Sequence, residues 1–145
     1  MSARQVCDFL VEGTPVPQGS KTGFVVGKRA IVTDANKTQL KPWRQVVAAA
    51  ARAAYDGPRI EGPVLLVVEF RFLRPKSVKR EWPSVKPDLD KLERALLDGL
   101  TDSGIWRDDS QVVSMPSKKV YAERAGVHVQ LGEYATPEKK ERAEK

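Results

Sequence analysis

Residues 86–113 read KPDLDKLERALLDGLTDSGIWRDDSQVV, and this stretch decides the fold. Apolar side chains recur at Leu92, Leu96 and Leu100, which predicts one buried face of a helix. Asp88 is a residue type that favours the position just before a first helical turn. We therefore expect a helix that begins after Asp88 and packs its apolar face against the core.

A second face of the same helix is polar. Asp90, Arg94 and Asp98 follow one another at four-residue steps and so line that face together. Asp108 and Asp109 come after a turn, immediately before a short apolar run that predicts a strand. Carboxylates in these positions either stabilise helix starts and turns or supply the oxygen ligands of a hard cation such as Mg²⁺. Their spacing alone leaves both interpretations open.

The composition of the whole chain narrows the class of protein. Its 145 residues suffice for one domain with a core and are too few for two ordinary domains. The single cysteine, Cys7, excludes an internal disulfide framework and favours a cytoplasmic location. No apolar run approaches the roughly 20 residues that span a bilayer, and nothing at the N-terminus resembles a signal peptide. The net charge of +6 indicates a polyanionic partner, most often nucleic acid.

The order of the predicted elements indicates an α+β fold, in which one mixed β-sheet packs with two main helices. Strands are predicted over 5–12, 23–26, 30–33, 63–73, 111–115, 118–122 and 127–131, and another helix over 34–55. The segments 111–115 and 118–122 are expected to form one long strand, interrupted by Pro116, that pairs with the strand at 127–131. Because proline is unfavourable inside a helix, the regular part of the helix within 34–55 is expected to begin near Pro42, whose missing N–H costs nothing in a first turn.

Residues 1–134 are expected to form a single domain, and the charged residues 135–145 a disordered tail. Within the domain, residues 74–86 (RPKSVKREWPSVK) connect a strand to the acidic helix and carry five Lys or Arg against one Glu. Such a loop either binds phosphates or is merely solvated. The candidates for DNA contact are Lys76, Lys79, Arg80 and Lys86, followed by Lys21 and Lys91. Trp82 either stacks on an opened base or anchors the loop by packing.

Motifs in this chain resemble those of a known family. The RusA family of Holliday junction resolvases, small phage and bacterial endodeoxyribonucleases, typically shows a (K/R)(P/R)DxDN segment, a later lysine, a further Asp and a DDxQ(V/I) segment. KPDLDKLERALLDGL and GIWRDDSQV, within residues 86–113, are similar to this signature. GTPVPQGSK, at 13–21, resembles the opening segment of the family more loosely.

The resemblance implies a RusA-like fold and a homodimer that uses Mg²⁺, or Mn²⁺, to nick two opposing strands of a four-way DNA junction in recombination and repair. The strands around 64–72 are candidates for the edge that forms the dimer. By position, Asp88, Asp90 and Asp109 match the catalytic residues that hold the metal. Asp98 and Asp108 match two further positions that are commonly acidic.

Two residues depart from the family pattern. Lys91 stands where the family usually has Asn, and Arg94 where it has a functionally important Lys. Arg94 keeps a positive charge near the scissile phosphate but cannot lose its proton to act as a base. We therefore interpret Arg94 as a catalytic residue that replaces the lysine electrostatically, with weakened catalysis as the alternative.

Two other functions stay open. The chain is alternatively a protein that binds branched DNA with weakened or no cleavage, or a nuclease that acts on flaps or forks. The remaining conspicuous side chains are expected to be structural. They are His128 in a strand, Cys7 in the core and Trp106 as a buried strut.

Overall fold

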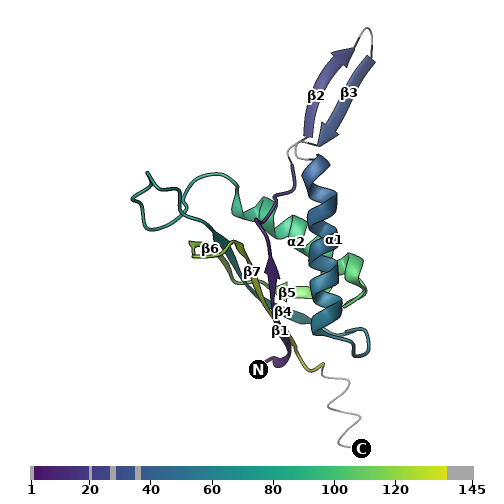
Figure 1. Cartoon of the computed structure of the whole chain (residues 1–145). Coiled ribbons are helices and arrows are strands. Elements are labelled where there is room, and N and C mark those ends of the chain that lie inside the picture. The colour runs from purple at the N-terminus through teal and green to yellow at the C-terminus, as the bar shows by residue number, and fades with distance from the viewer. Residues whose placement is uncertain (1, 20, 27–28, 35–36, 137–145) are drawn as a thin grey trace, which may run out of the picture.

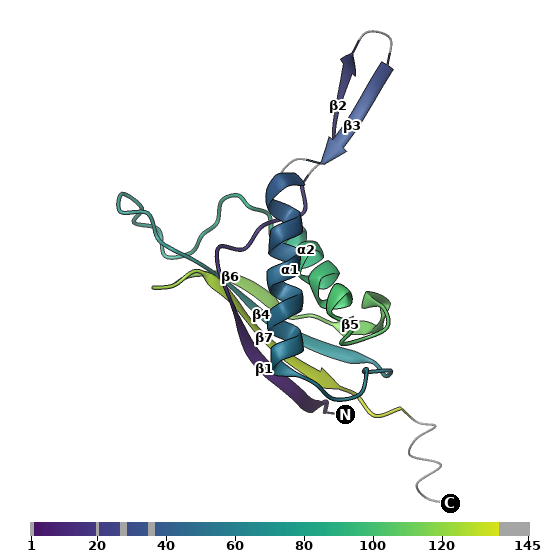
Figure 2. The ribbon, with the colours of Figure 1, turned by 45° about the vertical axis from the view of Figure 1, so that its right-hand side comes forward.

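The structure, a computed structural model, describes residues 2–19, 21–26, 29–34 and 37–136. One mixed five-stranded sheet carries both helices on the same face, as Figures 1 and 2 show from two directions. The strands are β1 (Arg4–Glu12), β2 (Lys21–Val26), β3 (Arg29–Asp34), β4 (Val64–Phe72), β5 (Val112–Ser114), β6 (Ser117–Tyr121) and β7 (Gly126–Glu133), and the helices are α1 (Lys37–Ala54), α2 (Leu89–Ser103) and the 3₁₀ helix η1 (Asp109–Gln111). The predicted α+β class is confirmed. Residues 137–145 of the predicted tail lie outside the described part of the chain.

β4 is the centre of the main sheet. β7 pairs with β4 in antiparallel orientation on one side and with β1 beyond, while β5 and β6 pair with β4 in parallel on its other side. Parallel neighbours need a crossover connection, and α2 lies in the connection between β4 and β5. β2 and β3 form a separate antiparallel hairpin, as predicted.

The two ends of β4 lie at different poles of the sheet. Val64, its first residue, pairs with Glu133, which also pairs with Arg4, so β1 begins and β7 ends at this pole. Phe72, its last residue, leads into the basic loop 74–86 and then into α2. One pole of the sheet therefore carries the first and last residues of the sheet, and the other carries the basic loop.

The expected pairing of 118–122 with 127–131 is wrong. β6 and β7 flank β4 on opposite sides, and the residues between them cross the end of β4, where the Ala122 N–H donates to the Phe72 carbonyl oxygen (2.9 Å). A polar turn between two short strands predicts a local hairpin, but β4 takes a partner on each of its two edges. Because both edges of β4 are paired, the strand at 64–72 cannot supply the edge of a dimer.

α1 differs from its prediction at one residue. The helix begins at Lys37, so Pro42 lies inside it and not in its first turn. Proline there removes one backbone hydrogen bond. Leu40, Trp43 and Val47 are buried in the core, and this burial stabilises the helix. Within the described ranges, no helix combines the length and apolar content that crossing a bilayer requires.

α2 begins where its sequence predicts, directly after Asp88. Asp88 is the N-cap residue, and Gly104 ends the helix in the left-handed conformation (φ 80°). Leu92, Leu96 and Leu100 are all buried, so the predicted apolar face is confirmed. The polar face that carries Asp90, Arg94 and Asp98 consequently points away from the core.

α1 and α2 pack closely where Gly99 meets Val47. A Cβ atom added at Gly99 would lie 2.7 Å from Val47 Cβ and 3.2 Å from the carbonyl oxygen of Arg44. We expect Gly99→Ala to lower the free energy of unfolding by about 1–2 kcal/mol, because this overlap outweighs what alanine gains in helix propensity. Urea unfolding followed by circular dichroism measures the change.

The matched background for this variant is Val47→Ala, which removes Val47 Cγ1, one of the two Val47 atoms that the new methyl group would meet at 2.7 Å. Gly99→Ala should cost less stability in the Val47→Ala protein than in the unaltered protein. An equal cost in both backgrounds would show that overlap with Val47 Cγ1 is not the cause.

The face of the sheet opposite the helices carries a polar cluster that joins β7 to β1. His128 Nε2 donates to Asp8 Oδ1 (2.6 Å), and Gln130 Nε2 donates to Asp8 Oδ2 (3.3 Å). The hydrogen bond from His128 holds the pKa of Asp8 below its ordinary value. The neighbouring Cys7 is buried in the core, as predicted, and this burial raises the pKa of its thiol to about 11.

The depressed pKa of Asp8 predicts a pH-dependent contribution to stability. Because the folded pKa lies below the unfolded value of about 3.9, the contribution is fully present above about pH 4 and is lost as the pH falls through the folded pKa. Asp8→Asn should therefore lower the melting temperature at pH 7 and at pH 5, and the difference should shrink below about pH 4. Melting temperatures of both proteins, measured by thermal unfolding from about pH 2 to pH 7, test this expectation. A constant difference down to about pH 2 would contradict a role for the Asp8 charge.

Candidate active site

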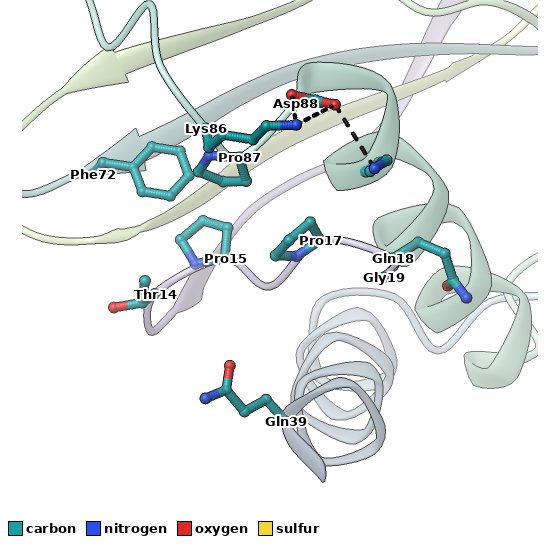
Figure 3. A pocket seen from close by; sticks show the side chains of 11 residues that line it. Thr14, Pro15, Pro17, Gln18, Gly19, Gln39, Phe72, Lys86, Pro87 and Asp88 are labelled. Carbon is teal, nitrogen blue, oxygen red and sulfur yellow. Dashed lines mark hydrogen bonds and ion pairs between the residues drawn. The ribbon is translucent and has the colours of Figure 1, made fainter. Parts of the chain in front are cut away.

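Asp88 holds the N-cap position of α2, but its side chain does not cap the helix. Its backbone is extended (φ −69°, ψ 139°), and its carboxylate accepts no capping hydrogen bond. The carboxylate lies 3.4 Å from Lys86 Nζ and 3.8 Å from Lys91 Nζ. Figure 3 shows Asp88 beside Lys86. The helix therefore forms without using the carboxylate of Asp88, which argues against the capping interpretation for this residue.

Asp90 lies in the first turn of α2 and is exposed. In the part of the chain that the structure describes, no hydrogen bond or ion pair engages its side chain. The partial positive charge of the helix N-terminus favours a carboxylate in this turn. Asp88 and Asp90 thus present two carboxylates at the end of α2 that adjoins the basic loop.

The adjacent residues Asp108 and Asp109 have different surroundings. Asp108 caps η1, because its Oδ2 accepts a hydrogen bond from the N–H of Ser110 (3.0 Å). The hydrogen bonds from Ser110 hold the pKa of Asp108 below its ordinary value. Asp109 is half-buried, and its side chain has no hydrogen bond to any described residue. Asp108 is therefore a structural residue, and the carboxylate of Asp109 is left for another use.

Gln111 fixes the position of this acidic pair, and the sequence analysis did not single it out. Its Oε1 accepts hydrogen bonds from the N–H groups of Arg107 (2.8 Å) and Asp108 (3.0 Å). Its Nε2 donates to the carbonyl oxygens of Ile60 (2.9 Å) and Gly62 (3.1 Å). The signal that would have identified it is the Asp-x-x-Gln spacing of a capping box.

Asp98 and Asp109 lie within electrostatic range of each other, although they belong to different elements. Burial raises the pKa of Asp98, the positive charge of Arg44 opposes this rise, and the negative charge of Asp109 adds to it. Asp98, predicted only as an additional acidic position, is therefore close to a predicted metal ligand. The structure thus brings one carboxylate of the polar face of α2 toward the segment that follows the helix.

Arg94 is exposed on α2, one turn before Asp98, and its positive charge favours the ionised form of that residue. Arg44 does not present its guanidinium in the same way, because two hydrogen bonds to Asp102 engage it (2.9 and 3.0 Å). Arg94 is therefore a cation on this face that a substrate phosphate can approach.

The candidate carboxylates form two groups along α2. Asp88 and Asp90 lie at its N-terminus, and Asp98, with Asp109 near it, follows about 12 Å further along the axis. Among the residues that the structure describes, no three Asp, Glu, His or Cys side chains gather closely enough to hold a metal ion. Carboxylates repel one another unless a cation lies between them. Their oxygen atoms are nevertheless the donor type that Mg²⁺ prefers, so the convergence of Asp88, Asp90 and Asp109 on a metal stays a prediction.

The basic loop 74–86 is shaped by Arg74. Its Nη1 donates to the carbonyl oxygen of Arg80 (2.7 Å), and its guanidinium lies over the Tyr121 ring, 4.7 Å from the centroid. Arg74 is therefore a structural cation, and it is not among the predicted DNA contacts.

The predicted phosphate contacts of this loop are accessible. Lys76, Lys79 and Arg80 are exposed, and no ion pair within the described ranges engages their side chains. Trp82 is also exposed, with 53% of its surface accessible. Lys21 begins β2, but its side chain lies outside what the structure describes. The loop thus presents cations and one aromatic ring to solvent beside the N-terminus of α2.

A pocket of about 550 Å³ adjoins Asp88, and Figure 3 shows its lining. Two hydrogen-bonded contacts fix its walls: the N–H of Gln18 donates to the Lys91 carbonyl oxygen (2.9 Å), and Lys119 Nζ donates to the Pro87 carbonyl oxygen (2.8 Å). The pocket is lined by Thr14, Pro15, Pro17, Gln18, Gly19, Gln39, Phe72, Lys86, Pro87, Asp88 and Lys91.

The chain is similar to known proteins over most of its length. Residues 12–132 match the family model described as endodeoxyribonuclease RusA. The chain is 34% identical over 137 residues to the uncharacterized protein YqaN of Bacillus subtilis (strain 168), a match that covers 86% of this chain and 94% of YqaN. It is 37% identical over 73 residues to the crossover junction endodeoxyribonuclease rusA of Lactococcus phage r1t, a match that covers 49% of this chain and 55% of the phage protein.

Proposed function

Because this chain belongs to the RusA family of endodeoxyribonucleases, we propose that it resolves four-way DNA junctions by hydrolysing two opposing strands. Such paired nicks serve DNA recombination and repair. Two symmetric cuts require two symmetric sites, so the acting form in this proposal is a homodimer. The cofactor is Mg²⁺, and Mn²⁺ is expected to replace it.

One observation carries the proposal: the aspartates of the motif are not used alike by the fold. Asp108 caps η1, whereas Asp88 occupies an N-cap position without capping it. Asp90 and Asp109 have no hydrogen-bonding partner among the described side chains and backbone. If these carboxylates served only to cap helices, each would accept a backbone hydrogen bond as Asp108 does.

In the proposed mechanism, Asp88, Asp90 and Asp109 would hold one or two Mg²⁺ ions, for which the two groups of carboxylates must come closer than the roughly 12 Å that separates them along α2. Asp98 would be a fourth carboxylate beside Asp109. A Mg²⁺ ion bound there would lower the pKa of a water molecule and polarise the phosphoryl group. Lys86 and Lys91, which face Asp88, lie where they attract the DNA backbone. The chain's own residues thus provide both the ligands for the metal and cations for the phosphates.

Arg94 is assigned the stabilisation of negative charge at the scissile phosphate. It is exposed on the polar face of α2, between Asp90 and Asp98. A guanidinium donates two parallel hydrogen bonds to a phosphate, and such donors stabilise charge that develops in the transition state. Because arginine keeps its proton, Arg94 acts electrostatically and not as a base.

The decisive experiment is a cleavage assay on a labelled four-way junction with and without Mg²⁺. The same arm sequences are assembled into a flap, a fork and a linear duplex as comparison substrates. We expect paired nicks at symmetric positions of the four-way junction, only with the metal. If the protein cut the flap or the fork in preference to the four-way junction, it would be a flap or fork nuclease and not a junction resolvase. If it cut none of the four substrates, the proposal that it is an active nuclease would be wrong.

A second candidate function rests on Arg94, which stands where lysine is usual. If the missing lysine is essential, the protein binds branched DNA without cutting it. Arg94→Lys separates the two candidates, because it would create cleavage in a non-cleaving protein and would change the rate of a working enzyme only moderately. Junction affinity, measured for both proteins, serves as the control for folding.

Contacts from the basic loop should appear in the salt dependence of binding. Each phosphate contact that is lost reduces the slope of log K against log salt by about 0.9. We expect Arg80→Gln to reduce the slope by about 0.9 and the combined change of Lys76, Lys79 and Arg80 to glutamine by up to about 2.7. Arg4→Gln, an exposed arginine at the start of β1 on the sheet edge opposite β5, is the matched control. A slope that falls equally for Arg4→Gln would contradict a specific role for the loop.

A further inference from the structure

The pocket beside Asp88 is not explained by phosphodiester hydrolysis alone. Its volume of about 550 Å³ lies within the range of small-molecule sites, roughly 300–1,000 Å³. Four separate parts of the chain form it: residues 14–19, the start of α1, the end of β4 and residues 86–91. It shares Asp88 and Lys91 with the candidate active site, so a ligand in the pocket would lie next to the reacting phosphate.

The walls of the pocket are largely flat and apolar. Pro15, Pro17 and Pro87 surround the same space, and the Phe72 ring lies beside Pro87, as Figure 3 shows. Phe72 is only partly buried, although it packs against the core. Proline and phenylalanine rings offer the kind of surface on which a planar aromatic ligand stacks.

The mouth of the pocket is polar and positively charged. Thr14 and Gln39 are exposed and carry a hydroxyl and an amide that suit the edge of a heterocycle. Lys86, with 83% of its side chain accessible, and Lys91 lie on the side of Asp88. The combination of apolar rings with adjacent ammonium groups fits a ligand that has an aromatic part and an anionic part.

We propose that this pocket receives one unpaired nucleotide of the DNA substrate, adjacent to the phosphodiester that is cut. The base lies between the proline rings and Phe72, and its phosphate faces Lys86. A paired base cannot enter, because its partner strand would have to follow, so the ligand is a base that has left its stack. The proposal rests on the proposed function, and it identifies the part of the substrate that the chain recognises besides its backbone.

The test is a scan of abasic sites through a four-way junction. Single nucleotides around the branch point are replaced one at a time by an abasic residue, and binding is measured by fluorescence anisotropy in EDTA, which prevents cleavage. We expect the removal of one particular base in the symmetry-related strands to weaken binding by about 5- to 150-fold, the usual effect of losing one stacked base. Removal of the other bases should have little effect.

Gln39→Trp is the informative variant, because it places a large side chain at the mouth of the pocket without changing charge. The Gln39→Trp protein should bind the intact junction and every abasic junction with similar affinity. Gln45→Trp is the matched control: it changes an exposed glutamine of the same helix outside the pocket and should keep the loss. Circular dichroism of both variants checks that the fold is intact.

The inference is overturned if no abasic position weakens binding, or if Gln39→Trp keeps the same position-specific loss as Gln45→Trp. Cleavage of the same junctions with Mg²⁺ separates this inference from the proposed function. Position-specific loss without cleavage would support the pocket and contradict the nuclease. Cleavage without position-specific loss would support the nuclease and contradict the pocket, and absence of junction binding would overturn both.

Discussion

Asp90→Asn is expected to reduce cleavage of a four-way junction by about 10³-fold or more, because an amide carries no charge to hold a metal ion. Asp90 is exposed at the N-terminus of α2, and its side chain has no partner in the described ranges. The substitution therefore removes no visible contact that stabilises the fold. Junction affinity should be retained, since the change removes a negative charge that faces DNA.

The measurement is a single-turnover cleavage rate with Mg²⁺, together with junction binding in EDTA. Asp56→Asn is the matched control, because it makes the same change of charge at an exposed aspartate before β4, at the opposite pole of the sheet from α2's N-terminus. The control should cleave at the normal rate. Normal cleavage by Asp90→Asn would remove Asp90 from the catalytic residues.

Trp106→Ala is expected to lower the free energy of unfolding by about 3–5 kcal/mol, the usual cost of truncating a buried aromatic residue. Trp106 is 1% exposed, and its Nε1 donates to Thr101 Oγ1 (2.8 Å). Trp106 also forms a backbone bridge to Ile60. Since the free energy of unfolding of a whole domain is only about 5–15 kcal/mol, this one change would remove a large part of it.

Urea unfolding measures this loss, and Trp106→Phe provides the matched variant. Phenylalanine keeps most of the apolar volume and removes the hydrogen bond to Thr101, so a smaller loss of about 1–2 kcal/mol is expected. If alanine cost no more than phenylalanine, the predicted role of Trp106 as a buried strut would be wrong. Asp108 and Asp109 lie two and three residues after Trp106, so unfolding near Trp106 should also weaken the candidate site.

Local sequence signals predicted α2 well. The leucines at four-residue steps and Asp88 before the helix act over a few residues, so one segment contains the necessary information. The pairing of β6 with β4 was not predicted, because it joins residues that are far apart in the chain. The residues between β6 and β7 resemble a hairpin turn, and this local signal predicted the wrong partner.

The roles of the aspartates likewise depend on contacts between residues that are far apart in the chain. For Asp88 and Asp108, sequence spacing left a structural role and a metal-ligand role equally open, and only the three-dimensional structure shows that Asp108 caps a helix and Asp88 does not. The proximity of Asp98 and Asp109 depends on how the chain folds back after Trp106. The pocket was not predictable, because its lining comes from four distant segments.

The register of the main sheet has a practical consequence. Arg4 and Glu133 pair at one pole, whereas the basic loop, Asp88 and the pocket lie at the other end of β4, about 30 Å away along the strand. A fluorescent dye or affinity tag joined to either end of the domain would therefore be attached far from the basic loop and the pocket. Protein immobilised in this way should keep both of them accessible, which suits single-molecule observation of junction binding.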